Sequence, residues 1–158
     1  TNKNVMFATD AHYNLGAVGE NVVIIGGGEV GTETALHLAR CGKKVTIIEA
    51  INRLADNLNY TSRIQLIHLI ETNEKITSYV NTKCTEITDE AVKIVDQEGK
   101  EKLIAADTVI LAAGYKAKKE ESETFRDLAY DFIQVGDCVK ASNIQWAITS
   151  AFDAAITL

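Results

Sequence analysis

The chain has 158 residues, of which 46% are hydrophobic and 24% charged, so it can fold around a buried core. Its net charge of −6 argues against nucleic acid or an anionic membrane surface as a partner. No apolar run reaches the length needed to cross a membrane, and the start at Thr1 leads us to expect an excised piece of a longer protein.

Residues 1–20 carry few signals of regular structure. Thr9 or Asp10 could cap a short helical turn, and Gly16 and Gly19 come shortly before the first strongly apolar run. We expect this segment to be a linker without a core of its own.

The stretch that follows predicts a dinucleotide-binding unit. The apolar run Val22–Ile25 is typical of a buried strand, and the glycines at positions 26, 28 and 31 fit the pattern G-x-G-x-x-G. A helix is expected from about residue 29 to Cys41. A second apolar run, Val45–Ile48, then ends in Glu49. Strand, glycine turn, helix, strand and acid follow one another in the order that nucleotide binding requires.

Each residue type in this unit has a physical reason. Gly26 allows the tight turn out of the strand, Gly28 lets the backbone approach a pyrophosphate, and Gly31 lets the helix pack closely on the strand. The helix N-terminus would face the phosphates. Glu49 could accept the hydroxyl protons of the adenosine ribose and repel a 2′-phosphate, which favours NAD over NADP, although Arg53 lies near enough in sequence to affect that choice.

The next elements extend a parallel sheet and then interrupt it. A helix starting at Thr61 or Ser62 leads to a third strand near Ile76–Val80. Three short runs at 83–88, 91–96 and 102–105, joined by tight turns, predict a three-stranded antiparallel meander. The apolar run Asp107–Ala112 then returns to the sheet. The predicted fold is α/β, a Rossmann-like parallel sheet with an inserted meander.

The last part of the chain is less regular. Residues 116–131 are charged and weakly periodic, which favours a solvated helix or loop. We expect a strand over Phe132–Val135 that ends in Gly136 and Asp137, then a final helix from about Asn143.

Neither the cysteines nor the histidines form a recognisable site. Cys41, Cys84 and Cys138 are far apart and lack a C-x-x-C pattern, so we predict small thiols in a reducing cytoplasm, with no metal site. His37 and His68 fall in predicted helices and are interpreted as packing or surface residues.

Three motifs in this order resemble one family. They are the glycine-rich stretch Gly26–Ala35, the strand end Ala112–Tyr115 and the segment Val135–Val139. Together they resemble the NADH:flavin oxidoreductases related to 2,4-dienoyl-CoA reductase and 2-enoate reductase. In those flavoproteins a nicotinamide domain is inserted into a FAD domain. Relatives often carry a proline near the position of Ala117, where this chain has none.

The resemblance implies the site residues and the cofactors. NAD(H) would bind at Gly26, Gly27, Gly28, Glu29, Val30, Gly31 and Glu49, with Glu33, Ala113 and Gly114 along the path to the nicotinamide, and Asp137 would contact FAD. No catalytic residue is assigned. The presumed full-length enzyme would add the first half of the FAD domain, an FMN barrel and a 4Fe-4S cluster, and would pass hydride from NADH to FAD for reduction of an activated C=C bond or similar small-molecule acceptor.

The implied organisation has three parts. Residues 1–20 would be a linker from the FAD domain, 21–113 the NAD(P)-binding domain, and 114–158 the return segment of the FAD domain, a strand and a helix. Two alternatives remain open. One is a direct NAD-dependent dehydrogenase, for which Tyr115 and Tyr130 are the only obvious proton donors; the other is a non-enzymatic NADH-sensing domain.

Overall fold

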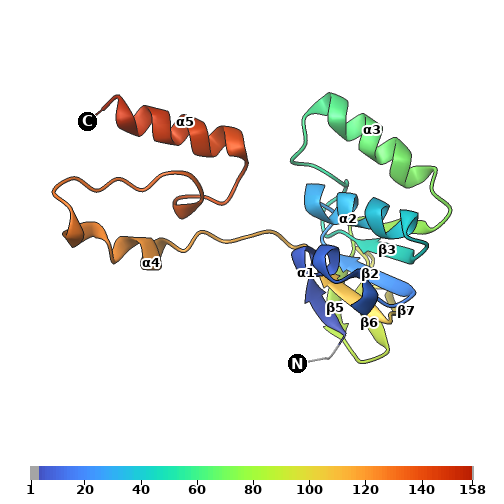
Figure 1. Ribbon diagram of the computed structural model, residues 1–158. Helices are drawn as coiled ribbons and strands as arrows, with labels where there is room; N and C mark the ends of the chain where they lie inside the picture. The colour runs from blue at the N-terminus through green and yellow to red at the C-terminus, as the bar shows by residue number, and fades with distance from the viewer. Residues whose placement is uncertain (1–3, 158) are drawn as a thin grey trace. The chain divides into compact units, whose positions relative to one another are not determined.

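The computed structural model describes residues 4–157, which divide after Gly114 into two compact units. We call the part up to Gly114 unit 1 and the part from Tyr115 onward unit 2, and each is described by itself (Figure 1). Unit 1 contains, in order, β1 (Val5–Phe7), α1 (Ala8–Tyr13), the 3-10 helix η1 (Leu15–Ala17), β2 (Asn21–Ile25), α2 (Glu29–Arg40), β3 (Lys44–Ile48), α3 (Tyr60–Glu71), β4 (Ile76–Tyr79), β5 (Lys83–Ile87), β6 (Ala91–Val95), β7 (Glu101–Ala105) and β8 (Thr108–Leu111).

The larger of the two sheets of unit 1 has five strands, is parallel throughout and has the strand order β1-β8-β2-β3-β4. β2 lies at its centre, with Ile24 opposite Ile47 of β3 on one side and Ile110 of β8 on the other. The return of the chain to this sheet after the meander confirms the predicted α/β architecture. A central strand with neighbours on both sides and helices over its face must be apolar, which is why the run Val22–Ile25 has no polar residue.

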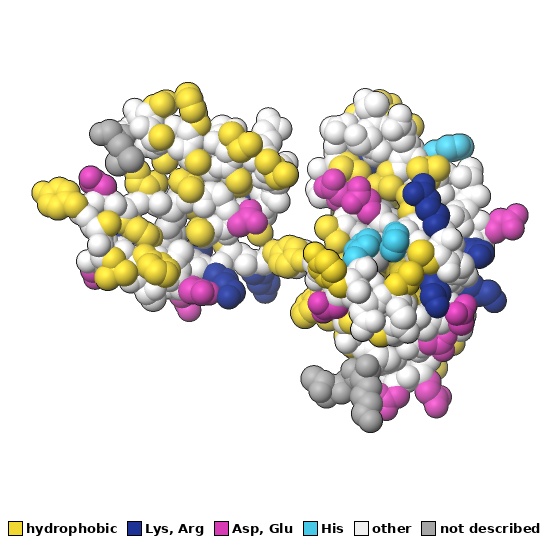
Figure 2. Space-filling model, viewed as in Figure 1, with side chains coloured by type: hydrophobic (Ala, Val, Ile, Leu, Met, Phe, Trp, Pro, Cys, Tyr) yellow, Lys and Arg dark blue, Asp and Glu magenta, His cyan; other side chains and the backbone are white. Residues whose placement is uncertain are grey.

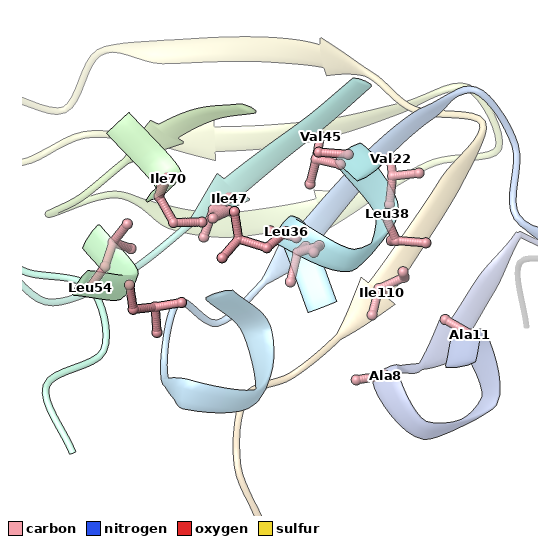
Figure 3. Packing of buried hydrophobic residues seen from close by; sticks show 14 of the residues in the cluster. Ala8, Ala11, Val22, Leu36, Leu38, Val45, Ile47, Leu54, Ile70 and Ile110 are labelled. Carbon is pink, nitrogen blue, oxygen red and sulfur yellow. The ribbon is translucent and has the colours of Figure 1, made fainter. Parts of the chain in front are cut away.

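Alternate residues of each strand serve two separate cores. Side chains such as Val22, Ile47 and Ile110 point to the face covered by helices, where they meet Leu36 and Leu38 of α2 (Figure 3). The period of two along a strand places the neighbours of these residues on the opposite face. Both faces are therefore buried, and the helix layer covers one of them.

The meander covers the other face. β5, β6 and β7 form an antiparallel sheet in that order, with tight turns between successive strands. Val92 and Ile94 of β6 pack with Val23, Ile48 and Val109 of the parallel sheet in a second buried cluster. The predicted insertion is thus confirmed, and it forms a third layer opposite the helices.

The expectation that residues 1–20 carry no core is wrong for the described part of that segment. Val5–Phe7 forms a fifth parallel strand, which pairs with β8 in the register Val5 to Val109. Ala8 and Ala11 of α1 are buried in the helix-side core, as Figure 3 shows. A strand of three residues is too short to show an alternation of apolar and polar residues in the sequence. Its pairing with β8 is made by backbone groups, which leave no trace in the choice of side chains.

Unit 2 has less regular structure than expected. It contains α4 (Lys119–Glu123), the 3-10 helices η2 (Arg126–Leu128) and η3 (Gly136–Cys138), and α5 (Ile144–Ala155). The predicted strand over Phe132–Val135 is not formed, so that prediction is wrong for this chain. The final helix is confirmed, and the side chain of Asn143 caps it by accepting from the backbone N–H of Trp146 at 2.9 Å. Across residues 4–157, no helix is long and apolar enough to cross a membrane.

The buried position of α1 gives a direct test of its place in the core. Ala11 is fully buried, so we expect Ala11→Asp to leave a charge without water or a partner and to destabilise unit 1 by at least about 3 kcal/mol. The matched control is Thr9→Asp, which puts the same side chain on an exposed position of the same helix. Urea unfolding monitored by circular dichroism measures both. Equal stability of the two variants would mean that residues 8–13 are a linker after all.

Candidate functional site

The predicted nucleotide-binding residues of unit 1 meet at one edge of the parallel sheet. β2, β3 and β8 run in the same direction, so their carboxyl ends lie side by side. The glycine turn follows β2, Glu49 follows β3, and Ala113 and Gly114 follow β8. The carboxyl edge of a parallel sheet is where α/β proteins bind their ligands.

Two glycines of the turn are required by the fold itself. Gly26 has φ +106°, and a Cβ there would lie 2.4 Å from the carbonyl oxygen of Ala112. Gly31, in the first turns of α2, would place a Cβ 1.9 Å from the carbonyl oxygen of Gly26. Any larger residue at either position would push α2 or β8 away from β2.

Gly27 is also confined by protein atoms, whereas Gly28 is not. A Cβ at Gly27 would lie 2.4 Å from Cδ2 of Leu54. A Cβ at Gly28 would meet nothing closer than Oδ1 of Asn57, at 3.7 Å, and the φ of Gly28 is −68°, which any residue can adopt. No contact within unit 1 explains a glycine at this position. The space that a side chain would fill fits a ligand that approaches the backbone, as a pyrophosphate does.

The start of α2 supplies hydrogen-bond donors at the same place. Gly28 is the N-cap residue, and it has no side chain to cap the first turn. The backbone N–H of Glu29 instead donates to Oδ1 of Asn57 at 3.1 Å, and Nδ2 of Asn57 lies 3.4 Å from Oε2 of Glu29. Val30, the next residue, is exposed. A helix N-terminus of this kind favours an anion through its free N–H groups and its dipole.

Asn57 is the functional candidate that sequence reasoning missed. It lies in the segment that joins β3 to α3, residues 50–59, which we call the β3–α3 loop. This segment reads as polar and irregular, and no motif distinguishes Asn57 within it. The only signal was its place in the chain, since a segment that starts at the carboxyl edge of the sheet begins beside the glycine turn.

Glu49 is already hydrogen-bonded to the glycine turn. Its Oε2 accepts from the backbone N–H of Gly27 at 2.6 Å, and its Oε1 accepts from the N–H of Ile51 at 2.9 Å. A carboxylate has about four acceptor positions. These two bonds therefore orient the Glu49 carboxylate and still leave it able to accept hydroxyl protons from a ribose.

The middle of the β3–α3 loop is hydrogen-bonded both to the glycine turn and to α3. The N–H of Ala55 donates to the carbonyl oxygen of Gly27 at 2.7 Å, and Ala55 has a positive φ of 50°. Nε of Arg63, in α3, donates to the carbonyl oxygen of Leu54 at 2.9 Å. The residues that flank Leu54 and Ala55 form an ion pair, in which Nε of Arg53 pairs with Oδ1 of Asp56. The loop is therefore part of the site wall and lies against the glycine turn.

The remaining predicted residues of unit 1 have these positions. Glu33 is exposed on α2, one turn beyond Glu29. Ala113 is exposed, but its backbone nitrogen lies next to Gly26, 3.0 Å from where a Cβ of that glycine would be. Gly114 has φ +85° with open space around it. The structure thus brings Ala113 to the glycine turn.

Asp137 belongs to unit 2 and is described apart from these residues. Its Oδ1 accepts from the backbone N–H of Ser142 at 3.2 Å, which stabilises the turn that leads into α5. Its neighbour Gly136 has φ +58°, donates its N–H to Oγ of Ser150 at 2.9 Å and packs on Ala147. The Gly-Asp segment is held on α5 with the Asp137 carboxylate exposed.

The cysteines and histidines have local roles. The ring of His12 lies near that of His37, with centroids 4.9 Å apart and the ring planes tilted by 34°, and Nε2 of His12 lies 3.2 Å from Oγ1 of Thr34. Burial raises the pKa of the Cys84 thiol. Within residues 4–157 no group of three or more histidine, cysteine and acidic side chains is arranged to hold a metal ion.

Comparison with known proteins places this geometry in a family. A family profile described as pyridine nucleotide-disulphide oxidoreductase matches residues 2–142. Cinnamate reductase from Clostridium sporogenes is 38% identical over 147 residues, covering 87% of this chain and 21% of that protein. NADH oxidase from Thermoanaerobacter brockii is 36% identical over 86% of this chain and 21% of its own length.

Solved structures agree with these relatives. One described as 2-naphthoyl-CoA reductase in complex with 2-naphthoyl-CoA superposes with a TM-score of 0.86 and 28% identity, over 99% of this chain and 24% of that one. The chain therefore spans about a fifth of the length of the curated relatives it matches. By the match over residues 2–142 and the glycine turn that it contains, the chain belongs to the pyridine nucleotide-disulphide oxidoreductase family.

Proposed function

We propose that this chain is the NAD(P)H-binding part of a flavin-dependent oxidoreductase that passes hydride from NADH to FAD, for reduction of an activated C=C bond or similar acceptor. The observation that carries the proposal is Gly28, a glycine without a structural reason, beside the first backbone N–H groups of α2. Relatives named cinnamate reductase and NADH oxidase support the reaction class.

The residues of unit 1 would divide the dinucleotide between them. The pyrophosphate would lie over Gly28 and take up the N–H groups of Glu29 and Val30, so the Oδ1 of Asn57 would have to release its hydrogen bond. Glu49 would accept from the adenosine ribose. Glu33 would lie toward the nicotinamide end, with Ala113 and Gly114 along the same path.

Unit 2 would contribute to a flavin site whose other half lies elsewhere in the parent enzyme. Asp137 would contact FAD, but unit 2 has no glycine-rich phosphate turn of its own. Three apolar side chains of α5 and its C-cap residue Ile156 recur every four residues, and so lie toward one side of the helix. They are largely exposed: Ile144 78%, Ile148 64%, Phe152 63% and Ile156 67%. Figure 2 shows hydrophobic side chains over much of the visible face of this unit.

We propose that this α5 face packs on the missing half of the FAD domain, because an exposed apolar stripe of this length is costly in water. An FMN barrel and a 4Fe-4S cluster would complete the electron path to the acceptor, as the family resemblance implies. We place the parent enzyme in the reducing cytoplasm, where thiols such as those of Cys41, Cys84 and Cys138 stay free.

The exposure of the two candidate proton donors argues against the direct dehydrogenase. Tyr115 and Tyr130, the proton donors that a dehydrogenase would need, have exposed fractions of 74% and 105%. A proton donor is expected to be held beside its substrate by surrounding groups. The flavin spectrum of the full-length protein would distinguish the three possibilities.

Gly28→Val tests the pyrophosphate position. The new side chain enters space free of protein atoms other than the flexible end of Asn57, so unit 1 should fold while NADH binding weakens severely. The matched control is Gly16→Val, because a Cβ at Gly16 meets nothing within 4 Å and lies outside the site. Fluorescence titration with NADH, with circular dichroism for folding, measures both variants. Unchanged affinity in folded Gly28→Val would refute the assignment.

Glu49→Ala tests the coenzyme choice. Loss of the carboxylate removes a ribose acceptor and a charge that repels a 2′-phosphate, so the preference for NADH over NADPH should fall. The difference at stake is on the order of 1–3 kcal/mol, as for a hydrogen bond to a charged group. The ratio of the two dissociation constants is the readout. A wild-type protein that already binds NADPH more tightly would contradict the role of Glu49.

The 158-residue chain on its own should be colourless and inactive. One carboxylate and the start of α5 cannot replace the phosphate turn, adenosine pocket and ring contacts of a full FAD site, because binding must first offset several kcal/mol of lost freedom. The test is to record its visible spectrum, add FAD, and assay NADH oxidation with a dye acceptor. NADH binding in the same sample is the positive control. Stoichiometric yellow protein with turnover would show that a complete flavin site exists within these residues.

A further inference from the structure

The Arg53–Asp56 ion pair lies in the β3–α3 loop, which begins directly after the proposed ribose acid Glu49. We propose that Asp56 is a specificity-determining residue, which excludes the 2′-phosphate of NADPH by holding and neutralising Arg53. The inference rests on the proposed function, because it concerns the adenosine end of the same nucleotide site.

Arg53 is placed where an arginine could read a 2′-phosphate. Nucleotide-binding folds that accept NADP use an arginine near the ribose acid for this purpose. Arg53 comes four residues after Glu49, and the N–H of Ile51 donates to Oε1 of Glu49, so the start of the β3–α3 loop is tied to that acid. Its guanidinium can donate two parallel hydrogen bonds to a phosphate.

Two contacts fix the part of the loop that contains Asp56. Ala55 donates its N–H to Gly27, and Leu54 accepts from Arg63, so the backbone just before Asp56 is held against the glycine turn and α3. Asp56 is thereby anchored beside the site. The Oδ1 of Asp56 accepts a hydrogen bond from Nε of Arg53. This pairing occupies one donor of the guanidinium and offsets its positive charge.

The charges of the site support the same conclusion. Glu49, Arg53 and Asp56 together carry a net charge of −1, and Glu29 adds a further carboxylate at the start of α2. A 2′-phosphate would meet repulsion from these three acids, while the positive charge of Arg53 is already paired with Asp56. Replacing Asp56 with a neutral residue would leave Arg53 free to pair with that phosphate.

The ion pair is exposed enough to be removed without harm to the fold. The side chains of Arg53 and Asp56 are 57% and 43% exposed. Exposed pairs of this kind contribute little to the free energy of unfolding. A change in coenzyme affinity can therefore be assigned to the site and not to lost stability.

The experiment measures dissociation constants of NADH and NADPH by fluorescence titration of the whole chain. Asp56→Asn should tighten NADPH binding about fivefold, the equivalent of about 1 kcal/mol, and leave NADH binding within about twofold. The double variant Arg53→Gln with Asp56→Asn should lose that gain, because the gain depends on the freed guanidinium. The matched control is Glu123→Gln, which breaks an Arg–Glu pair of the same spacing in unit 2 and should change neither constant.

Two outcomes, each observed while NADH binding stays normal, would overturn this inference and leave the proposed function standing. One is unchanged NADPH affinity in Asp56→Asn; the other is an equal gain in the double variant, which would reflect the lost negative charge and not Arg53. Binding of neither coenzyme by the wild-type chain would overturn the proposed function itself, and the inference with it.

Discussion

The contact between Gly31 and the carbonyl of Gly26 determines how the site is built. Gly31 has no Cβ, which would otherwise lie 1.9 Å from that oxygen, and α2 can therefore pack directly on the turn that follows β2. This close approach fixes where the first amides of the helix point. Gly26 in turn lies against the end of β8, so three elements of the sheet edge meet around one glycine turn. The position of Gly28 at the mouth of this turn follows from the same packing.

Much of this arrangement could be predicted from the sequence, because local pattern and tertiary packing agree there. The glycine turn, α2, β3, the meander and β8 each have a period or a turn residue that matches the element formed. β1 could not be predicted, since a short edge strand gains its stability from β8 and not from its own residues. The segment Phe132–Val135 failed in the opposite way: its apolar residues suit a strand, but no neighbouring strand in the described part of unit 2 pairs with it.

The candidate site was predictable to a similar degree. The glycines and Glu49 follow from a motif whose spacing reflects phosphate and ribose geometry. The contributions of Asn57 and Asp56 do not, because they depend on how the β3–α3 loop folds back on Gly27. That path is set at the loop middle, where the side chain of Leu54 is buried and its carbonyl oxygen accepts from Nε of Arg63 in α3. Sequence spacing alone carries no information about such a return.

The end of β8 is both part of the wall around the glycine turn and the point where the chain leaves unit 1. The covalent connection from unit 1 to unit 2 starts at Ala112–Gly114, and the first two of these residues form the wall against which Gly26 turns. The chain thus leaves unit 1 beside the candidate nucleotide site. The peptide groups at which the chain leaves unit 1 are therefore also those that confine the glycine turn at Gly26.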